Sequence, residues 1–229
     1  MYTFAKVIFN CLLLKQIIAV LKKDVVLEWR NKFTIAGIAI QVLTSVFIVY
    51  LAIPALNLPI QNSLFWIILV FSCLNAVTKG FIAEPIALQN YLQQLVPSRI
   101  LIRSKLAYNF LLITGITFLI WLVFNLLIGE FPGNQSYYLG IVLLSSLGIS
   151  SAFTLMSALV RKLPNAYLIV PVISLPIIIP ILIIGINASK KALDGLSAEF
   201  IQKDLLLLGS ICIFAVIMCE ILYVILDKN

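Results

Sequence analysis

Histidine is absent from this 229-residue chain, which removes the side chain most often used for acid–base catalysis and for metal binding. The sequence contains no GxxxxGK[ST] motif, so it lacks a phosphate-binding loop for ATP. Its four cysteines are Cys11, Cys73, Cys212 and Cys219, and none of them forms a CxxC pair. We interpret them as small buried hydrophobic residues. The sequence therefore predicts no catalytic residue, no metal site and no cofactor held by this chain.

Polar side chains inside apolar stretches are the remaining candidates for chemistry. The ones that stand out are Asn75, Asn125 and Glu220. An ion-coupled pump carries several membrane-embedded charged groups, whereas here only Glu220 lies clearly within a span. We interpret it as a carboxylate that pairs with a neighbouring helix or reaches the membrane surface; a direct role in transport is the alternative. The small residues between Ser145 and Ser151 predict close helix packing.

Composition indicates that the elements holding these residues lie in lipid. The chain is 62% hydrophobic and 11% charged, against about 45–50% and about 25% for soluble domains. This balance excludes a soluble enzyme, a nucleic-acid-binding domain and a disordered scaffold. We attribute the net charge of +7 to basic segments that face the cytoplasm and anionic headgroups. The lipid bilayer is thus an expected partner, and nucleic acid is not.

Six segments are long and apolar enough to cross a bilayer, which takes about 20 residues. The predicted spans are 33–53, 64–83, 106–128, 139–160, 166–186 and 205–226. The predicted fold class is therefore all-α, a polytopic membrane protein with six transmembrane helices over residues 33–229.

Residues 1–32 are predicted to form an N-terminal cytoplasmic helix that lies in the membrane interface. Its basic residues on one arc of roughly 100° are Lys15, Lys22, Lys23 and Arg30. Asp24 and Glu28 lie on the opposite side, so the amphipathic pattern is imperfect.

The distribution of basic residues predicts that both termini are cytoplasmic. An even number of spans places both termini on the same side of the membrane. That side has 13 of the 16 basic residues. The opposite side has only Lys190, Lys191 and Lys203. Cysteines placed at Asn134 and Ser189 should then be accessible from outside, and one at Ser98 should not.

The fifth predicted span contains Pro171, Pro176 and Pro180. Each proline lacks a backbone N–H donor and clashes with the carbonyl four residues earlier. We therefore predict a bent or broken helix, enclosed by protein rather than facing lipid. Either an ordinary kinked helix or a moving, substrate-facing element fits this pattern.

A short amphipathic helix is predicted between the second and third spans, on the cytoplasmic face. Leu88, Tyr91, Leu92 and Leu95 recur at helical spacing, Pro97 ends the helix, and Ser98 is expected to cap the next one. This segment suits docking to a soluble ATPase, and a helix lying on the lipid surface is the alternative. The candidate docking residues are Glu84, Leu88, Tyr91, Leu92, Leu95, Pro97, Ser98 and Arg99.

Three stretches of the chain together resemble a known family. They are the charged segment 21–32, the segments 91–98 and 104–109 around the docking helix, and the proline-rich segment 175–185. In their order and spacing they are similar to the haem exporter protein B (CcmB) family, the permease-like subunit of the bacterial cytochrome c maturation ABC complex.

This resemblance implies an ABC-2 exporter-like subunit of the bacterial cytoplasmic (inner) membrane, with two copies per complex. It implies a separate cytoplasmic ABC ATPase and haem-handling membrane proteins as partners, with haem as a possible cargo. Haem export and ATP-driven release of a haem-loaded chaperone both fit. The alternatives are an ABC-2 permease for a lipid, drug or polysaccharide, and a membrane scaffold that transports nothing.

Overall fold

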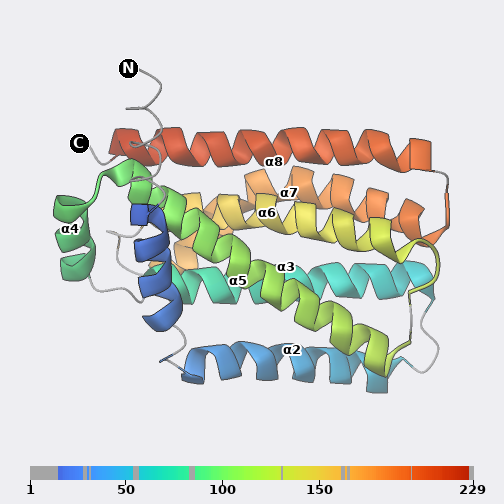
Figure 1. The fold of residues 1–229 in the computed structure, drawn as a ribbon. Coiled ribbons are helices and arrows are strands. Elements are labelled where there is room, and N and C mark those ends of the chain that lie inside the picture. The colour runs from blue at the N-terminus through green and yellow to red at the C-terminus, as the bar shows by residue number, and fades with distance from the viewer. Residues whose placement is uncertain are drawn as a thin grey trace.

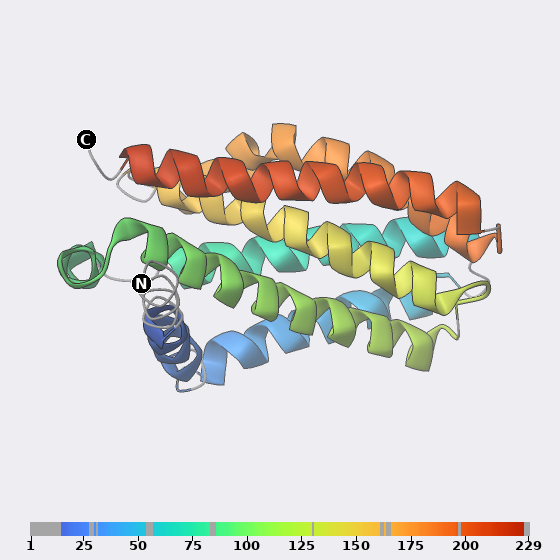
Figure 2. The same cartoon turned by 45° about the horizontal axis from the view of Figure 1, so that its top comes forward.

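In a computed structural model, the chain forms a bundle of long helices that lie side by side (Figures 1 and 2). The structure describes residues 15–27, 30, 32–53, 57–82, 86–129, 131–160, 163, 166–196 and 198–226. The helices are α2 (Lys32–Ala52), α3 (Leu58–Ile82), α4 (Ile86–Leu95), α5 (Ser98–Leu127), α6 (Gln135–Val160), α7 (Ala166–Leu193) and α8 (Ala198–Leu226). A further helix over 15–27 precedes them, and no strand occurs in these ranges. The all-α prediction is confirmed.

The long helices alternate in direction along the chain (Figure 1). The short helix α4 and the helix over 15–27 lie at one end of the bundle, which we call the α4 end. The connections that follow α2, α5 and α7 lie at the other, which we call the far end.

Among the described residues, five helices are long and apolar enough to cross a membrane, namely α3, α5, α6, α7 and α8. The chain is therefore a polytopic helical membrane protein. The first predicted span corresponds to α2, whose apolar described part, Ala36–Ala52, is shorter than the other five. The sixth span accordingly stays a prediction.

Several helices extend beyond the predicted apolar segments. The helix α5 begins at Ser98 rather than at 106, α7 continues to Leu193 rather than ending at 186, and α8 begins at Ala198 rather than at 205. Hydropathy marks only the part of a helix that fits in hydrocarbon, whereas backbone hydrogen bonding continues into the polar ends. Lys191 on α7 and Asp204 on α8 form an ion pair of 2.6 Å there, within helices rather than in a loop.

The helix α6 is the centre of the bundle, with α3, α5, α7 and α8 packed around it. Of its span, 72% is buried, against 22% for α8. Small residues make this close packing possible: a side chain added at Gly148 would lie 2.7 Å from Cys212 Sγ and 3.0 Å from Ile181 Cδ1. The predicted packing role of the segment from Ser145 to Ser151 is borne out by the burial of both residues.

Of the predicted bent or broken fifth span, the broken form is wrong, because α7 is one continuous helix through Pro171, Pro176 and Pro180. The bent form stays a prediction. Its side toward the bundle is a continuous buried stripe that includes Val170 and Ile178. Pro176 and Pro180 lie on the exposed side of this chain, so this chain alone does not enclose the span, and its enclosure within an assembly stays a prediction. Packing along the buried stripe holds the helix together although each proline removes one backbone hydrogen bond.

Candidate functional site

The helix α4 stands out from the end of the bundle (Figures 1 and 2). Tyr91 and Leu95 are 58% and 59% exposed, whereas Leu88 and Leu92 are half-buried. The four residues therefore form an apolar stripe, of which the side with Tyr91 and Leu95 is exposed. Of the other predicted docking residues, Glu84 lies outside the described part of the chain.

The connection from α4 to α5 is short and well hydrogen-bonded. Pro97 is the N-cap of α5, and its carbonyl accepts hydrogen bonds from the backbone of Ile100 (2.8 Å) and Leu101 (3.2 Å). Ser98 was expected to be the cap but is instead the first residue of the helix. Proline suits the cap position because its ring fixes the backbone and no N–H is needed there. Pro97 and Arg99, which follow α4 in the sequence, are also exposed.

The first turns of α5 are held on one side by α8. Arg103 donates from Nε to Glu220 Oε1 at 2.9 Å and from Nη2 to Oε2 at 3.0 Å. The pair is partly open to the surroundings, with side chains 50% and 34% exposed. Glu220, singled out in the sequence as an intramembrane carboxylate, thus has its partner on a neighbouring helix.

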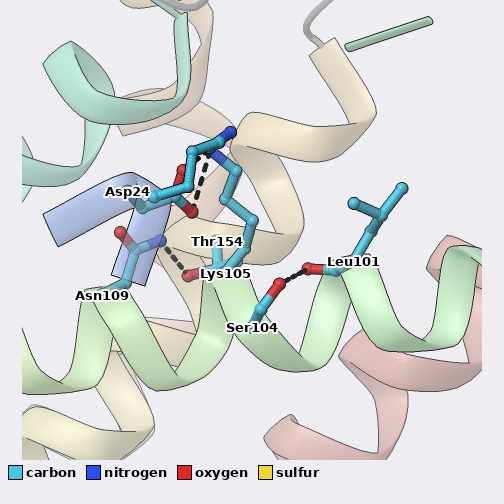
Figure 3. Close-up of polar contacts among 7 residues, drawn as sticks. Asp24, Leu101, Ser104, Lys105, Asn109 and Thr154 are labelled. Carbon is cyan, nitrogen blue, oxygen red and sulfur yellow. Dashed lines mark hydrogen bonds and ion pairs between the residues drawn. The ribbon is translucent and has the colours of Figure 1, made fainter. Parts of the chain in front are cut away.

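A second ion pair holds α5 to the N-terminal helix (Figure 3). Asp24 Oδ2 lies 3.5 Å from Lys105 Nζ, and Asp24 Oδ1 lies 3.0 Å from Lys23 Nζ. The Asp24 side chain is only 5% exposed and that of Lys105 only 14%. One turn further along α5, Asn109 donates from Nδ2 to Thr154 Oγ1 of α6 at 2.8 Å. Residues 103–109 of α5 therefore contact three other elements through polar side chains.

Sequence reasoning missed the role of Asp24, which it treated as a flaw in an amphipathic helix. The signal was present, since an acidic residue opposite a basic arc is a candidate for an ion pair with another element. Its partner Lys105 lies 81 positions later in the sequence (105 − 24), and no pattern within the helix points to it.

The two polar residues Asn75 and Asn125 connect neighbouring segments. Asn75 donates from Nδ2 to Gln41 Oε1 at 3.1 Å, which joins α3 to α2. Asn125 donates to the Trp121 carbonyl at 2.9 Å and accepts from the backbone of Phe131 at 3.3 Å, which ties the end of α5 to the following connection. Both contacts serve packing and loop closure.

The far end contains a buried polar cluster that the sequence did not predict. Trp66 Nε1 and Asn62 Nδ2 both donate to Ser189 Oγ at 3.0 Å, and the Ser189 hydroxyl donates to the Ile186 carbonyl at 2.9 Å. Tyr138 donates to Asn62 Oδ1 at 3.4 Å. Ser189 is fully buried, so the expectation that a cysteine there reacts from outside is wrong. The last turns of α7 pack against α3, whereas hydropathy had assigned them to a loop.

No group of three potential metal ligands occurs among the described residues. Cys73, Cys212 and Cys219 are buried, and Cys212 Sγ lies 3.3 Å from the Leu144 carbonyl of α6. These cysteines fill space between helices, as predicted.

A family model described as the CcmB protein matches residues 15–222. The chain belongs to the CcmB family. Its members are membrane components of the cytochrome c maturation haem export system. No curated protein and no solved structure matches the chain. The CcmB match begins where the described N-terminal helix begins and includes α4 and both ion pairs of α5.

Proposed function

We propose that this CcmB-family chain is the transmembrane subunit of an ABC complex that acts in cytochrome c maturation. It crosses the bacterial cytoplasmic membrane six times in an ABC-2 exporter-like arrangement, with α2 as the first span. Support comes from the family match and from the six long helices that alternate in direction in the described part of the chain. The α4 end faces the cytoplasm, because basic residues are more frequent there and favour that side. The described ones at the α4 end are Lys15, Lys22, Lys23, Arg30, Arg99, Arg103 and Lys105, against Lys190, Lys191 and Lys203 at the far end.

A separate ATPase docks on α4, and the observation that carries this proposal is the geometry of that helix. The helix projects from the end of the bundle (Figure 1), and its residues Tyr91 and Leu95 are exposed. Exposed apolar side chains on a projecting helix suit a protein groove. Because the connection at Pro97 is short, a displacement of α4 would also move α5. ATP hydrolysis takes place in the docked subunit, because this chain has no phosphate-binding loop.

Haem is the cargo of the complex, exported by it or carried by a chaperone that the ATPase cycle releases. Without histidine, this chain lacks the commonest haem ligand. We expect the purified subunit to show no Soret band at stoichiometric intensity. A strong band that disappears in Cys219→Ser would contradict this expectation.

Substitution on the exposed flank of α4 tests docking. Tyr91→Asp combined with Leu95→Asp should abolish co-purification of the ATPase, because two charges would be desolvated in the contact. The matched control is Leu196→Asp, since Leu196 is 46% exposed in the connection after α7 at the far end. Normal co-purification with the α4 variant at normal expression would argue against docking at α4.

Thiol labelling in spheroplasts tests the orientation independently. Cysteines at Asn134 and Lys190, both exposed at the far end, should react with an impermeant reagent from outside. A cysteine at Arg99, exposed at the α4 end, should react only after the membrane is opened. The reverse pattern would overturn the orientation while leaving the family assignment intact.

A further inference from the structure

The N-terminal helix over 15–27 has two different sides in the structure. Val20 and Asp24 face the bundle and are 7% and 6% exposed. Lys15 and Lys22 are exposed and lie about 20° apart on the outward side at 100° per residue. Arg30, which follows this helix in the sequence, is exposed as well. No hydrogen bond or ion pair joins these three to another described residue.

The outward side also carries apolar residues. Ile18 and Val26 are 59% and 45% exposed. None of the exposed described residues of this helix is acidic. Exposed apolar side chains are unfavourable in water. Apolar and basic side chains on one face suit the boundary between acyl chains and anionic headgroups.

The position of the helix agrees with such a boundary. In both views it crosses the α4 end at a steep angle to the long helices, so it lies roughly in the plane of a membrane that those helices cross (Figures 1 and 2). The helix α2 begins at Lys32, directly after it. Ile40, Leu43 and Phe47 of α2 are exposed apolar residues, so the lipid-facing surface starts there.

The ion pair of Asp24 with Lys105 fixes the rotation of the helix (Figure 3). If the helix were turned by half a circle, Asp24 would face the headgroups and the basic residues would face the bundle. The buried contact excludes this orientation, because the carboxylate would lose Lys105.

We propose that the outward face of this helix, formed by Lys15, Lys22 and Ile18, binds anionic phospholipids of the adjacent leaflet together with the exposed Arg30 that follows it. The partner is a lipid surface and not an acidic protein, because the exposed apolar residues lie among the basic ones. The binding does not depend on the proposed ATPase, so the two proposals fail separately.

The test is lipid retention by the purified full-length chain in equal mixtures of phosphatidylglycerol and phosphatidylcholine, measured by native mass spectrometry. The unmodified protein should retain more phosphatidylglycerol than phosphatidylcholine. The triple variant Lys15→Gln, Lys22→Gln, Arg30→Gln should lower this ratio about fivefold or more, since each cation near an anionic surface contributes roughly fivefold. The control Lys190→Gln, Lys203→Gln removes two exposed cations at the far end and should leave the ratio much less changed.

A ratio that is the same in the triple variant and the unmodified protein would overturn the proposal. So would equal losses in the triple variant and the control, which would show a general effect of net charge. Loss of a co-purifying acidic protein with unchanged lipid retention would assign the face to a protein instead. If the triple variant does not fold, the variant Lys15→Arg, Lys22→Arg should retain the full ratio, and a loss there would also contradict headgroup binding.

Discussion

The two ends of the bundle are held together by different chemistry. At the far end, Trp66 and Tyr138 are buried and hydrogen-bonded, and the cluster contains no charged side chain. Next to it, Phe131 stacks on Tyr138 at 4.7 Å between ring centroids, and Phe65 meets both rings edge-on. At the α4 end, ion pairs join α5 to its neighbours, and one of them is partly exposed. The far end also has a partly exposed ion pair, between Lys191 and Asp204, so the two ends differ in the buried neutral cluster, which the described part of the α4 end lacks.

This difference indicates which end of the bundle is expected to move. Buried aromatic rings and neutral hydrogen bonds have one good arrangement, and a shift leaves cavities or unpaired groups. A partly exposed ion pair costs little to break, because water and headgroups replace the partner. The far end therefore suits a fixed base, and the α4 end suits an element that responds to a docked partner.

The largest effect should follow from Trp66→Ala at the far end. It removes a ring that is 1% exposed and leaves a cavity, for which we expect a loss of about 3–5 kcal/mol. Thermal unfolding in detergent measures the loss. The control Phe71→Ala lies on the same helix, where the ring is 61% exposed, and should cost much less. Equal losses in the two variants would show that the far end is not a rigid base.

Gly133→Ala should be the next most severe change. The glycine has a positive φ of 85°, and an added side-chain carbon would lie 2.5 Å from the carbonyl oxygens of Ala192 and Leu193. Overpacking against backbone should cost about 3 kcal/mol. Gly195→Ala provides the control, because its φ of 70° gives backbone strain with no atom within 4 Å. If the two variants unfold at the same temperature, the close approach contributes nothing.

Lys105→Met should loosen the N-terminal helix without unfolding the bundle. Of its two partners among the described residues, Asp24 would keep Lys23, so we expect the local opening free energy of residues 15–27 to fall by about 2 kcal/mol. Hydrogen exchange of these residues measures this change. Lys203→Met, a change at an exposed position of the far end, is the control. Unchanged exchange in the Lys105 variant would refute the anchoring role of Asp24.

Glu220→Gln should have the smallest effect, below about 1 kcal/mol in thermal unfolding, because its partner Arg103 is 50% exposed. The matched change at the far end is Asp204→Asn, which breaks the pair with Lys191. A loss for Glu220→Gln as large as that for Trp66→Ala would mean that the two ends do not differ as described.

The sequence by itself determined the class of the protein and the approximate place of its helices. Long apolar segments can satisfy their backbone groups in lipid only as helices, so composition and length were sufficient for that prediction. The stripe from Leu88 to Leu95 likewise predicted α4, because helical spacing is a local property. The resemblance to the CcmB family, drawn from ordered segments, is confirmed.

Only the tertiary structure decided what the individual polar and proline residues do. Asp24 became an anchor because Lys105 is folded next to it, and Ser189 became buried because α7 continues and packs near Trp66. The prolines of α7 did not break the helix, because packing along its buried stripe outweighed their local cost. Hydropathy and spacing reflect the local preference of each residue for lipid or water and for a helix. The roles of these residues depend instead on side chains that lie far away in the sequence.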